Sequence, residues 1–182
     1  MPRESFHVEP SGATATARHY IRDVVYGAND GLITTFAVVS GVAGGGLSTL
    51  AVVVIGAANL AADGVSMGAG NLLAIRADER ARAAAGLPEL EAFPWKHGLA
   101  TMLAFMSAGI VPLLPYVLAG TRGQVYWSTA LTFLALFGLG ASRALVTVDR
   151  WWRSGLETLL LGVVVALAAY GAGLIAAVLA SD

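Results

Sequence analysis

The chain has 182 residues, of which 57% are hydrophobic and 13% charged, and its mean hydropathy is +0.71. Ordinary soluble domains carry about 25% charged residues, so we interpret this chain as an integral membrane protein rather than a soluble helical bundle with an oversized core. The net charge of −1 does not indicate a nucleic-acid partner, and the absence of Cys excludes disulfides, thiolate metal sites and iron–sulfur clusters.

Residues 1–20 are small and polar and lack the apolar region of a signal peptide. We predict that they form a mobile cytoplasmic tail that becomes ordered near Tyr20, followed by a transmembrane domain over 21–182. The three histidines, His7, His19 and His97, lie outside the long apolar runs. This placement argues against a membrane-embedded haem held by pairs of histidines.

Five apolar segments have the length of about 20 residues that a helix needs to cross a bilayer. They cover roughly 24–42, 50–75, 99–118, 126–146 and 156–179. Open strands would leave unpaired edges in lipid, and barrel strands are shorter and alternate in polarity. The predicted fold is therefore an all-α integral membrane protein with five transmembrane helices per protomer.

Glycine and proline interrupt these segments at defined places. Gly41 and Gly45 have GxxxG spacing, as do Gly64 and Gly68, and this spacing allows close helix packing either within one chain or between two chains. The second helix is expected to continue past the bilayer into a short cytoplasmic segment, 77–96, until Gly86 and Pro88 end it. Pro112 and Pro115 are expected to bend or break the third helix.

Basic residues predict the orientation in the membrane. All of the 11 Lys and Arg residues except Arg122 fall in the N-terminal segment, after the second helix or after the fourth helix. The positive-inside rule then places the N-terminus in the cytoplasm and the C-terminus outside. The small size and the Ala- and Gly-rich composition favour a bacterial inner membrane.

Two carboxylates, Asp30 and Asp63, lie well within the predicted spans. An intramembrane carboxylate costs about 2.5–3.5 kcal/mol on insertion scales, and no Lys or Arg lies at a comparable depth in the sequence. Each therefore needs a proton or a cation.

The second helix repeats polar or metal-binding side chains at every fourth residue, Asn59, Asp63 and Met67, which places them on one helical face. Carboxylate and amide oxygens suit hard ions, while a thioether favours transition metals such as Fe²⁺. Helix packing explains any one of these residues alone, but together they favour a divalent-metal pathway. No motif indicates an enzyme or a bound cofactor.

Four stretches together resemble the vacuolar iron transporter family: "NDGLITTFAVVSGVAGG", "AANLAADGVSMGAGNLLA", "GIVPLLPYVL" and "SGLETLLLGVVVALAAYGAG". The resemblance implies a homodimer of five-helix protomers, packed through helices one and two, that exchanges Fe²⁺ and often Mn²⁺ for protons. It also implies that Asp30 and Met67 line the pathway. The family's glutamate position is Asn59 here, and Asp63 is the candidate replacement.

The chain also departs from the family between helices two and three, where well-studied members carry a long Glu-rich cytoplasmic metal-collecting domain. Only about 20 residues occupy that region here, with four carboxylates that we interpret as a solvated linker: Asp78, Glu79, Glu89 and Glu91. The predicted function is a metal/proton antiporter that exports metal from the cytoplasm. The alternative is a dimeric membrane scaffold or accessory subunit without transport activity.

Overall fold

The computed structural model describes residues 5–118, 123–144 and 150–181, and within these ranges it is helical, without a strand. The elements are α1 (Ala13–Gly44), α2 (Thr49–Ala84), α3 (Pro94–Gly109), the 3₁₀ helix η1 (Val111–Leu113), α4 (Leu114–Leu118), α5 (Gln124–Arg143) and α6 (Trp151–Ser181). The all-helical class predicted from the sequence is confirmed, and each of the five apolar segments is largely helical.

Local signals set both ends of α2. The Ser48 side chain caps α2 by accepting a hydrogen bond from the Ala51 amide at 3.3 Å. At the other end, Gly86 has φ +69°, and the Leu87 amide donates to the Arg82 carbonyl at 2.9 Å. The second helix therefore does extend beyond its apolar part and stop before Gly86, as predicted.

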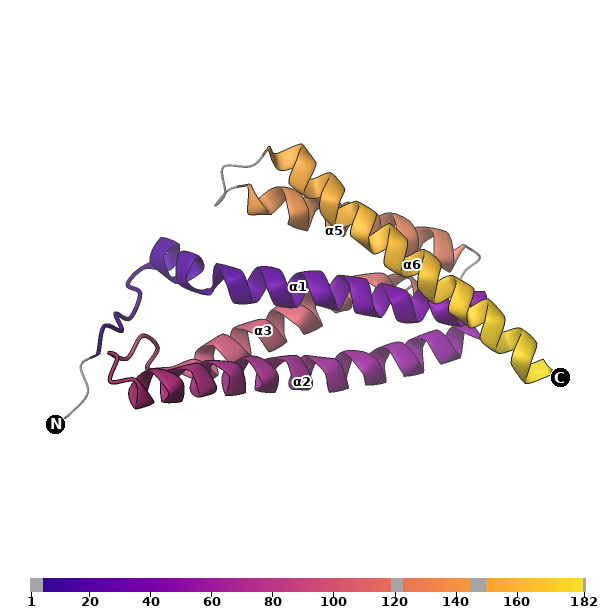
Figure 1. Cartoon of the computed structure of the whole chain (residues 1–182). Coiled ribbons are helices and arrows are strands. Elements are labelled where there is room, and N and C mark those ends of the chain that lie inside the picture. Colours follow the sequence, from indigo (N-terminus) through magenta and orange to yellow (C-terminus); the bar gives the residue numbers. More distant parts are fainter. Residues whose placement is uncertain (1–4, 119–122, 145–149, 182) are drawn as a thin grey trace.

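α1 lies at the centre of the bundle. It packs against α3 and α2 on one side and against α6 and α5 on the other (Figure 1). Phe105 of α3 is completely buried in the cluster between α1 and α2, and Leu136 of α5 is completely buried against Leu32 and Ile33 of α1. α1 is thus largely covered by other helices.

The run from α3 to α4 breaks at its prolines, as the sequence predicts. α3 ends at Gly109, η1 contains Pro112, and α4 contains Pro115. The buried Ser128 hydroxyl of α5 donates to the Pro112 carbonyl at 2.7 Å. This bond satisfies a backbone acceptor at the break, which a membrane-embedded helix requires.

Four helical runs are long and apolar enough to be candidate membrane spans: α2, the run Pro94–Leu118, α5 and α6. α6 exposes many large apolar side chains, including Leu160, Val164 and Leu167. Because water solvates such a surface poorly, the exposed apolar face favours contact with lipid. α1 is not among the four candidate spans, and it carries Asn29 and Asp30 near its middle.

One end of the bundle, which we call the basic end, contains the start of α1, the end of α2 and the starts of α3 and α6 (Figure 1). Basic side chains of these helices lie there, among them Arg18, Arg22, Arg82, Lys96 and Arg153. The C-terminus lies at the opposite end. The charge asymmetry seen in the sequence is therefore an asymmetry between two ends of the folded chain.

The N-terminal segment differs from the expected mobile tail. α1 begins at Ala13 rather than near Tyr20. The Phe6 amide donates to the Glu89 carbonyl at 2.8 Å, and Lys96 Nζ lies 2.5 Å from Glu9 Oε1. Residues 5–12 therefore pack against the segment between α2 and α3, which sequence reasoning had treated separately.

Candidate functional site

The two carboxylates that the sequence predicts within membrane spans lie on helices that pack against each other, Asp30 on α1 and Asp63 on α2. Both side chains are half-buried. Among the described residues neither forms an ion pair. Half-buried carboxylates without a basic partner are candidates for binding a cation.

Asn59 and Met67 lie one turn before and one turn after Asp63 on α2, and both are half-buried. Met67 packs against the buried core cluster that contains Phe105. It also lines a pocket of about 310 Å³ together with Tyr26 of α1 and with Asn71 and Ala74 of α2. The thioether is therefore placed between the core and an open pocket, where an ion can reach it.

Glycines bring α1 and α3 into close contact beside Asp30. A Cβ at Gly27 would collide with the Thr101 carbonyl, and one at Gly31 would collide with the Phe105 carbonyl. This contact buries the face of α1 next to Asp30 and fixes how the helix is rotated. Asp30 is thus held at the edge of the α1–α3 contact.

The GxxxG glycines pack against other helices of the same chain. A Cβ at Gly41 would lie 3.4 Å from the Ala169 carbonyl of α6, and one at Gly68 would lie 2.8 Å from the Gly98 carbonyl of α3. Gly45 and Gly64 likewise face α6 and α3. Of the two uses that the sequence left open for this spacing, the structure shows the contacts within one chain.

A polar network lies at the basic end of the contact between α1 and α2, beside the pocket of Tyr26 and Met67, and we call this contact with its pocket the groove. The buried Asp23 accepts a hydrogen bond from Asn71 Nδ2 at 2.9 Å and lies 2.5 Å from His97 Nδ1. Asn71 Nδ2 also donates to Thr101 Oγ1 at 2.7 Å. The network joins α1, α2 and α3 about two helical turns from Asp30 on α1 and from Asp63 on α2.

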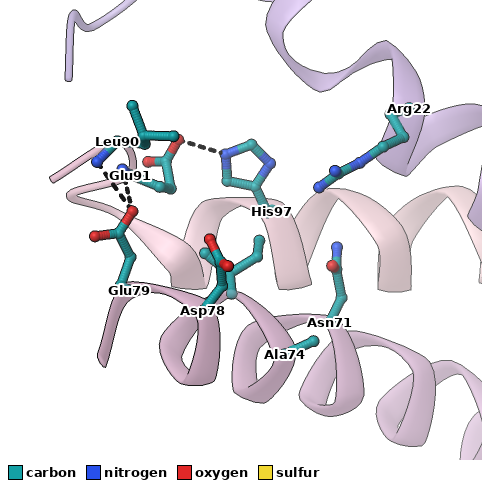
Figure 2. Close-up of a pocket in the computed structure, with 9 residues that line it drawn as sticks. Arg22, Asn71, Ala74, Asp78, Glu79, Leu90, Glu91 and His97 are labelled. Carbon is teal, nitrogen blue, oxygen red and sulfur yellow. Dashed lines mark hydrogen bonds and ion pairs between the residues drawn. The ribbon is translucent and has the colours of Figure 1, made fainter. Parts of the chain in front are cut away.

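A second pocket, of about 400 Å³, opens at this end (Figure 2). It is lined by residues of α1, α2, α3 and the segment between α2 and α3, including Arg22, Asp78, Glu91 and His97. Asn71 and Ala74 line both this pocket and the pocket of Met67. The two pockets are therefore neighbours along α2.

The acidic residues of the 77–96 segment are not simply a solvated linker. Asp78 is exposed, but Glu79 is buried, and its Oε1 accepts from the Leu90 and Glu91 amides at 2.9 Å each (Figure 2). Glu91 is half-buried; burial raises the pKa of its carboxyl, but the Phe93 amide and His97 outweigh burial and hold that pKa below its usual range. This correction matters because Glu91 points into the pocket, toward His97.

Sequence reasoning did not connect Glu91 with the histidines. His19 of α1, His97 of α3 and Glu91 offer three ligand atoms within 4.8 Å of one another. These residues come from separate segments and match no spacing motif. The one available signal was that three histidines and several carboxylates all fell in stretches predicted on one side of the membrane.

Four helical runs that are long and apolar enough to cross a bilayer define a multi-pass membrane protein. Comparison with known sequences agrees with that class. The sequence model of the VIT family matches residues 21–86 and 76–174. The chain belongs to the VIT family.

Its relatives include "Vacuolar iron transporter 1" of Eucalyptus grandis, 27% identical over 86% of each chain, and "Vacuolar iron transporter 1" of Arabidopsis thaliana, 26% identical over 85% of each. A "Vacuolar iron transporter" of Toxoplasma gondii is 41% identical over 36% of this chain and 22% of its own length. These relatives are named as transporters, not as enzymes. The two matched ranges overlap at 76–86, around the end of α2. This is the start of the 77–96 segment, which is shorter here than the corresponding domain of the family.

Proposed function

We propose that this chain transports divalent transition metals, Fe²⁺ and also Mn²⁺, across a membrane in exchange for protons. The observation that carries the proposal is the pair Asp30 and Asp63 on contacting helices, half-buried and without an ion-pair partner among the described residues. The names of the relatives, vacuolar iron transporters, support iron as the cargo.

The side chains of the groove suit such a cargo. Two carboxylates and the Asn59 amide supply oxygen ligands, and Met67 supplies a sulfur ligand that favours Fe²⁺ over harder ions. A carboxylate must lose its proton before it binds a metal ion, so protons and metal compete for the same groups. Competition at a site that opens alternately to the two sides of a membrane couples metal movement to proton movement in the opposite direction.

The topology belongs to the same proposal. We infer that α1 is a fifth span, although its own sequence is less apolar than those of the four candidates, because α2, α3, α5 and α6 cover much of its surface. A helix sheltered in this way tolerates Asp30 better than one exposed to lipid. Five spans place the basic end in the cytoplasm and the C-terminus outside, with transport directed out of the cytoplasm and, by our sequence reasoning, across a bacterial inner membrane.

A homodimer is the proposed assembly. The exposed face of α2 is rich in small residues, among them Ala58, Ala61, Ala62 and Ala69. Small residues allow helices to approach closely in a bilayer, where apolar burial gives little driving force. This face lies next to Asp63, so a second copy packed there would place two sets of groove residues near one axis.

Transport by purified protein in proteoliposomes tests the proposal. Uptake of Fe²⁺, Mn²⁺, Co²⁺ and Zn²⁺ is measured with and without a pH gradient, while a trapped dye reports internal pH. We expect uptake of Fe²⁺ and Mn²⁺ that the gradient accelerates, together with proton movement that depends on metal. Vesicles that show neither metal uptake nor metal-dependent proton movement would favour the scaffold alternative, which Asn59 and the short 77–96 segment motivate.

A further inference from the structure

All three histidines of the chain gather around one carboxylate, Glu91. His7 comes from the N-terminal segment, His19 from the second turn of α1 and His97 from the first turn of α3. The ring centroids of His19 and His97 are 4.9 Å apart, and those of His7 and His19 are 6.2 Å apart. Three distant segments therefore deliver their imidazoles to the same place beside the pocket at the basic end.

Two imidazole nitrogens lie close to the same oxygen of Glu91, and a third lies close to the other oxygen. His97 Nε2 lies 2.9 Å and His19 Nε2 lies 3.3 Å from Glu91 Oε2. His7 Nδ1 lies 3.4 Å from the other oxygen, Oε1. One ligand atom from each of His19, His97 and Glu91 lies within 4.8 Å of the other two, a separation that a single metal ion can bridge.

The convergent nitrogens are buried beside the Glu91 carboxylate. His97 is 6% exposed, and the Nε2 atoms of His97 and His19 make ion-pair contacts with Glu91. Both nitrogens of His7 are likewise buried, and they lie near Glu9 and Glu91. Several buried imidazole nitrogens around one carboxylate form a compact set of candidate metal ligands.

The surrounding groups orient these ligands. His97 Nδ1 lies 2.5 Å from Asp23 Oδ2, which favours a proton on Nδ1 and leaves the Nε2 lone pair directed at Glu91. Glu91 Oε1 accepts from the Phe93 amide at 3.0 Å, which turns Oε2 toward the two histidines. Carboxylate–histidine contacts of this kind typically position metal ligands.

Without a metal ion, an Nε2–H group on each imidazole can donate to the same carboxylate oxygen, because that oxygen accepts more than one hydrogen bond. With both Nε2 atoms deprotonated, the same three atoms are free to bind a cation. A divalent cation accepts electron pairs from all three atoms at once. Two imidazoles and one carboxylate are ligands that suit first-row transition ions, including Fe²⁺ and Zn²⁺.

We propose that His19, His97 and Glu91 form a second metal site, for a divalent first-row transition ion, at the basic end of the bundle. His7 supplies a fourth ligand when the N-terminal segment closes over the site. His97 and Glu91 line the pocket that shares Asn71 and Ala74 with the pocket of Met67, so an ion held here is next to the groove of α1 and α2. Metal binding at this site does not depend on the proposed transport function. The further step, in which the bound ion is cargo that moves on to the groove, does rest on that function.

Cobalt(II) binding to the purified full-length chain tests the site, because visible absorption of Co²⁺ reports nitrogen ligation. We expect His19→Ala and Glu91→Gln each to weaken Co²⁺ binding by about tenfold or more, since a three-ligand site loses one ligand. His19→Asp, which restores a ligand atom, should recover part of the affinity. His19 is chosen over His97 because His97 also holds the Asp23 network together. Circular dichroism and size-exclusion chromatography confirm that each variant is folded.

Asp30→Asn serves as the control for the groove and should keep the nitrogen-type Co²⁺ spectrum. Titrations of His19→Ala and Glu91→Gln that match the wild type in affinity and spectrum would overturn the proposal and leave the cluster as a protonated ion-pair network. The same conclusion follows if Asp30→Asn, but neither cluster variant, removes the Co²⁺ signal. The Co²⁺ titration measures binding to purified protein and does not require transport. A negative result in the uptake experiment therefore leaves the conclusion about this metal site unchanged.

Discussion

Asn71 of α2 donates a hydrogen bond to the buried Asp23 of α1 at 2.9 Å, about two helical turns along each helix from Asp63 and Asp30. Because α1 and α2 run antiparallel (Figure 1), this polar tie and the two carboxylates lie along the same helix–helix contact. The tie fixes how the two helices are placed along each other, and hence which residues of α2 face Asp30.

Replacing Asn71 should therefore destabilise the fold as well as alter the groove. Asn71→Ala removes the donor to both Asp23 and Thr101, and a buried carboxylate that loses a partner costs about 1–3 kcal/mol. We expect a lower thermal unfolding midpoint in detergent. Leu73→Ala, at an exposed site on the same helix, should leave the midpoint nearly unchanged. Equal midpoints for the two variants would mean that the tie contributes little.

Asp30→Asn should abolish metal uptake and the coupled proton flux, because it keeps the shape of the side chain and removes the group that exchanges a proton for a metal ion. Asp63→Asn should also impair uptake if Asp63 replaces the carboxylate absent at Asn59. Glu157→Gln, at an exposed position near the start of α6, is the matched control and should transport normally. Wild-type uptake by Asp30→Asn would show that Asp30 is a packing residue.

Met67→Leu should change metal preference more than overall activity. Leucine keeps the apolar volume against the Phe105 cluster but lacks the thioether. We expect Fe²⁺ and Co²⁺ uptake to fall more than Mn²⁺ uptake, because the harder ion gains less from sulfur. Competition between Fe²⁺ and Mn²⁺ in proteoliposomes measures this ratio. A proportional loss for all ions would indicate that Met67 acts only by packing.

Gly31→Ala should destabilise the chain by overpacking. The added Cβ collides with the backbone carbonyl of Phe105, which cannot move without shifting α3, and such overpacking typically costs about 1–3 kcal/mol. Gly138→Ala on α5 is the control, because a Cβ there meets nothing within 4 Å. The difference between their unfolding midpoints isolates the α1–α3 contact, and no difference would mean that this contact is looser than described.

Single cysteines at Ser11 and Ser181 should react with a membrane-impermeant reagent from opposite sides. The chain contains no Cys, so each introduced thiol is the only target. Labelling is compared in intact and permeabilised cells. If both positions react from the same side, an even number of spans crosses the membrane and α1 does not span it.

The sequence by itself determined the helical class, four of the five predicted spans, the end of α2 before Gly86 and the break at Pro112. These features depend on hydropathy over one helix length and on backbone limits at glycine and proline, which are local properties of the chain. The sequence also predicts that the basic residues gather at one end. Successive long helices run in opposite directions, so alternate connecting segments lie at the same end of the bundle, and the basic residues fall in such alternate segments.

Only the tertiary structure decided which helix faces meet. The GxxxG spacing of Gly41 and Gly45 is compatible with contacts within a chain or between chains, and the packing of α1 on α6 selects the first. The meeting of His7, His19, His97 and Glu91 had no local signal at all. It depends on how the start of α1, the start of α3 and the segment between α2 and α3 are brought together, and that placement comes from packing summed over the whole bundle.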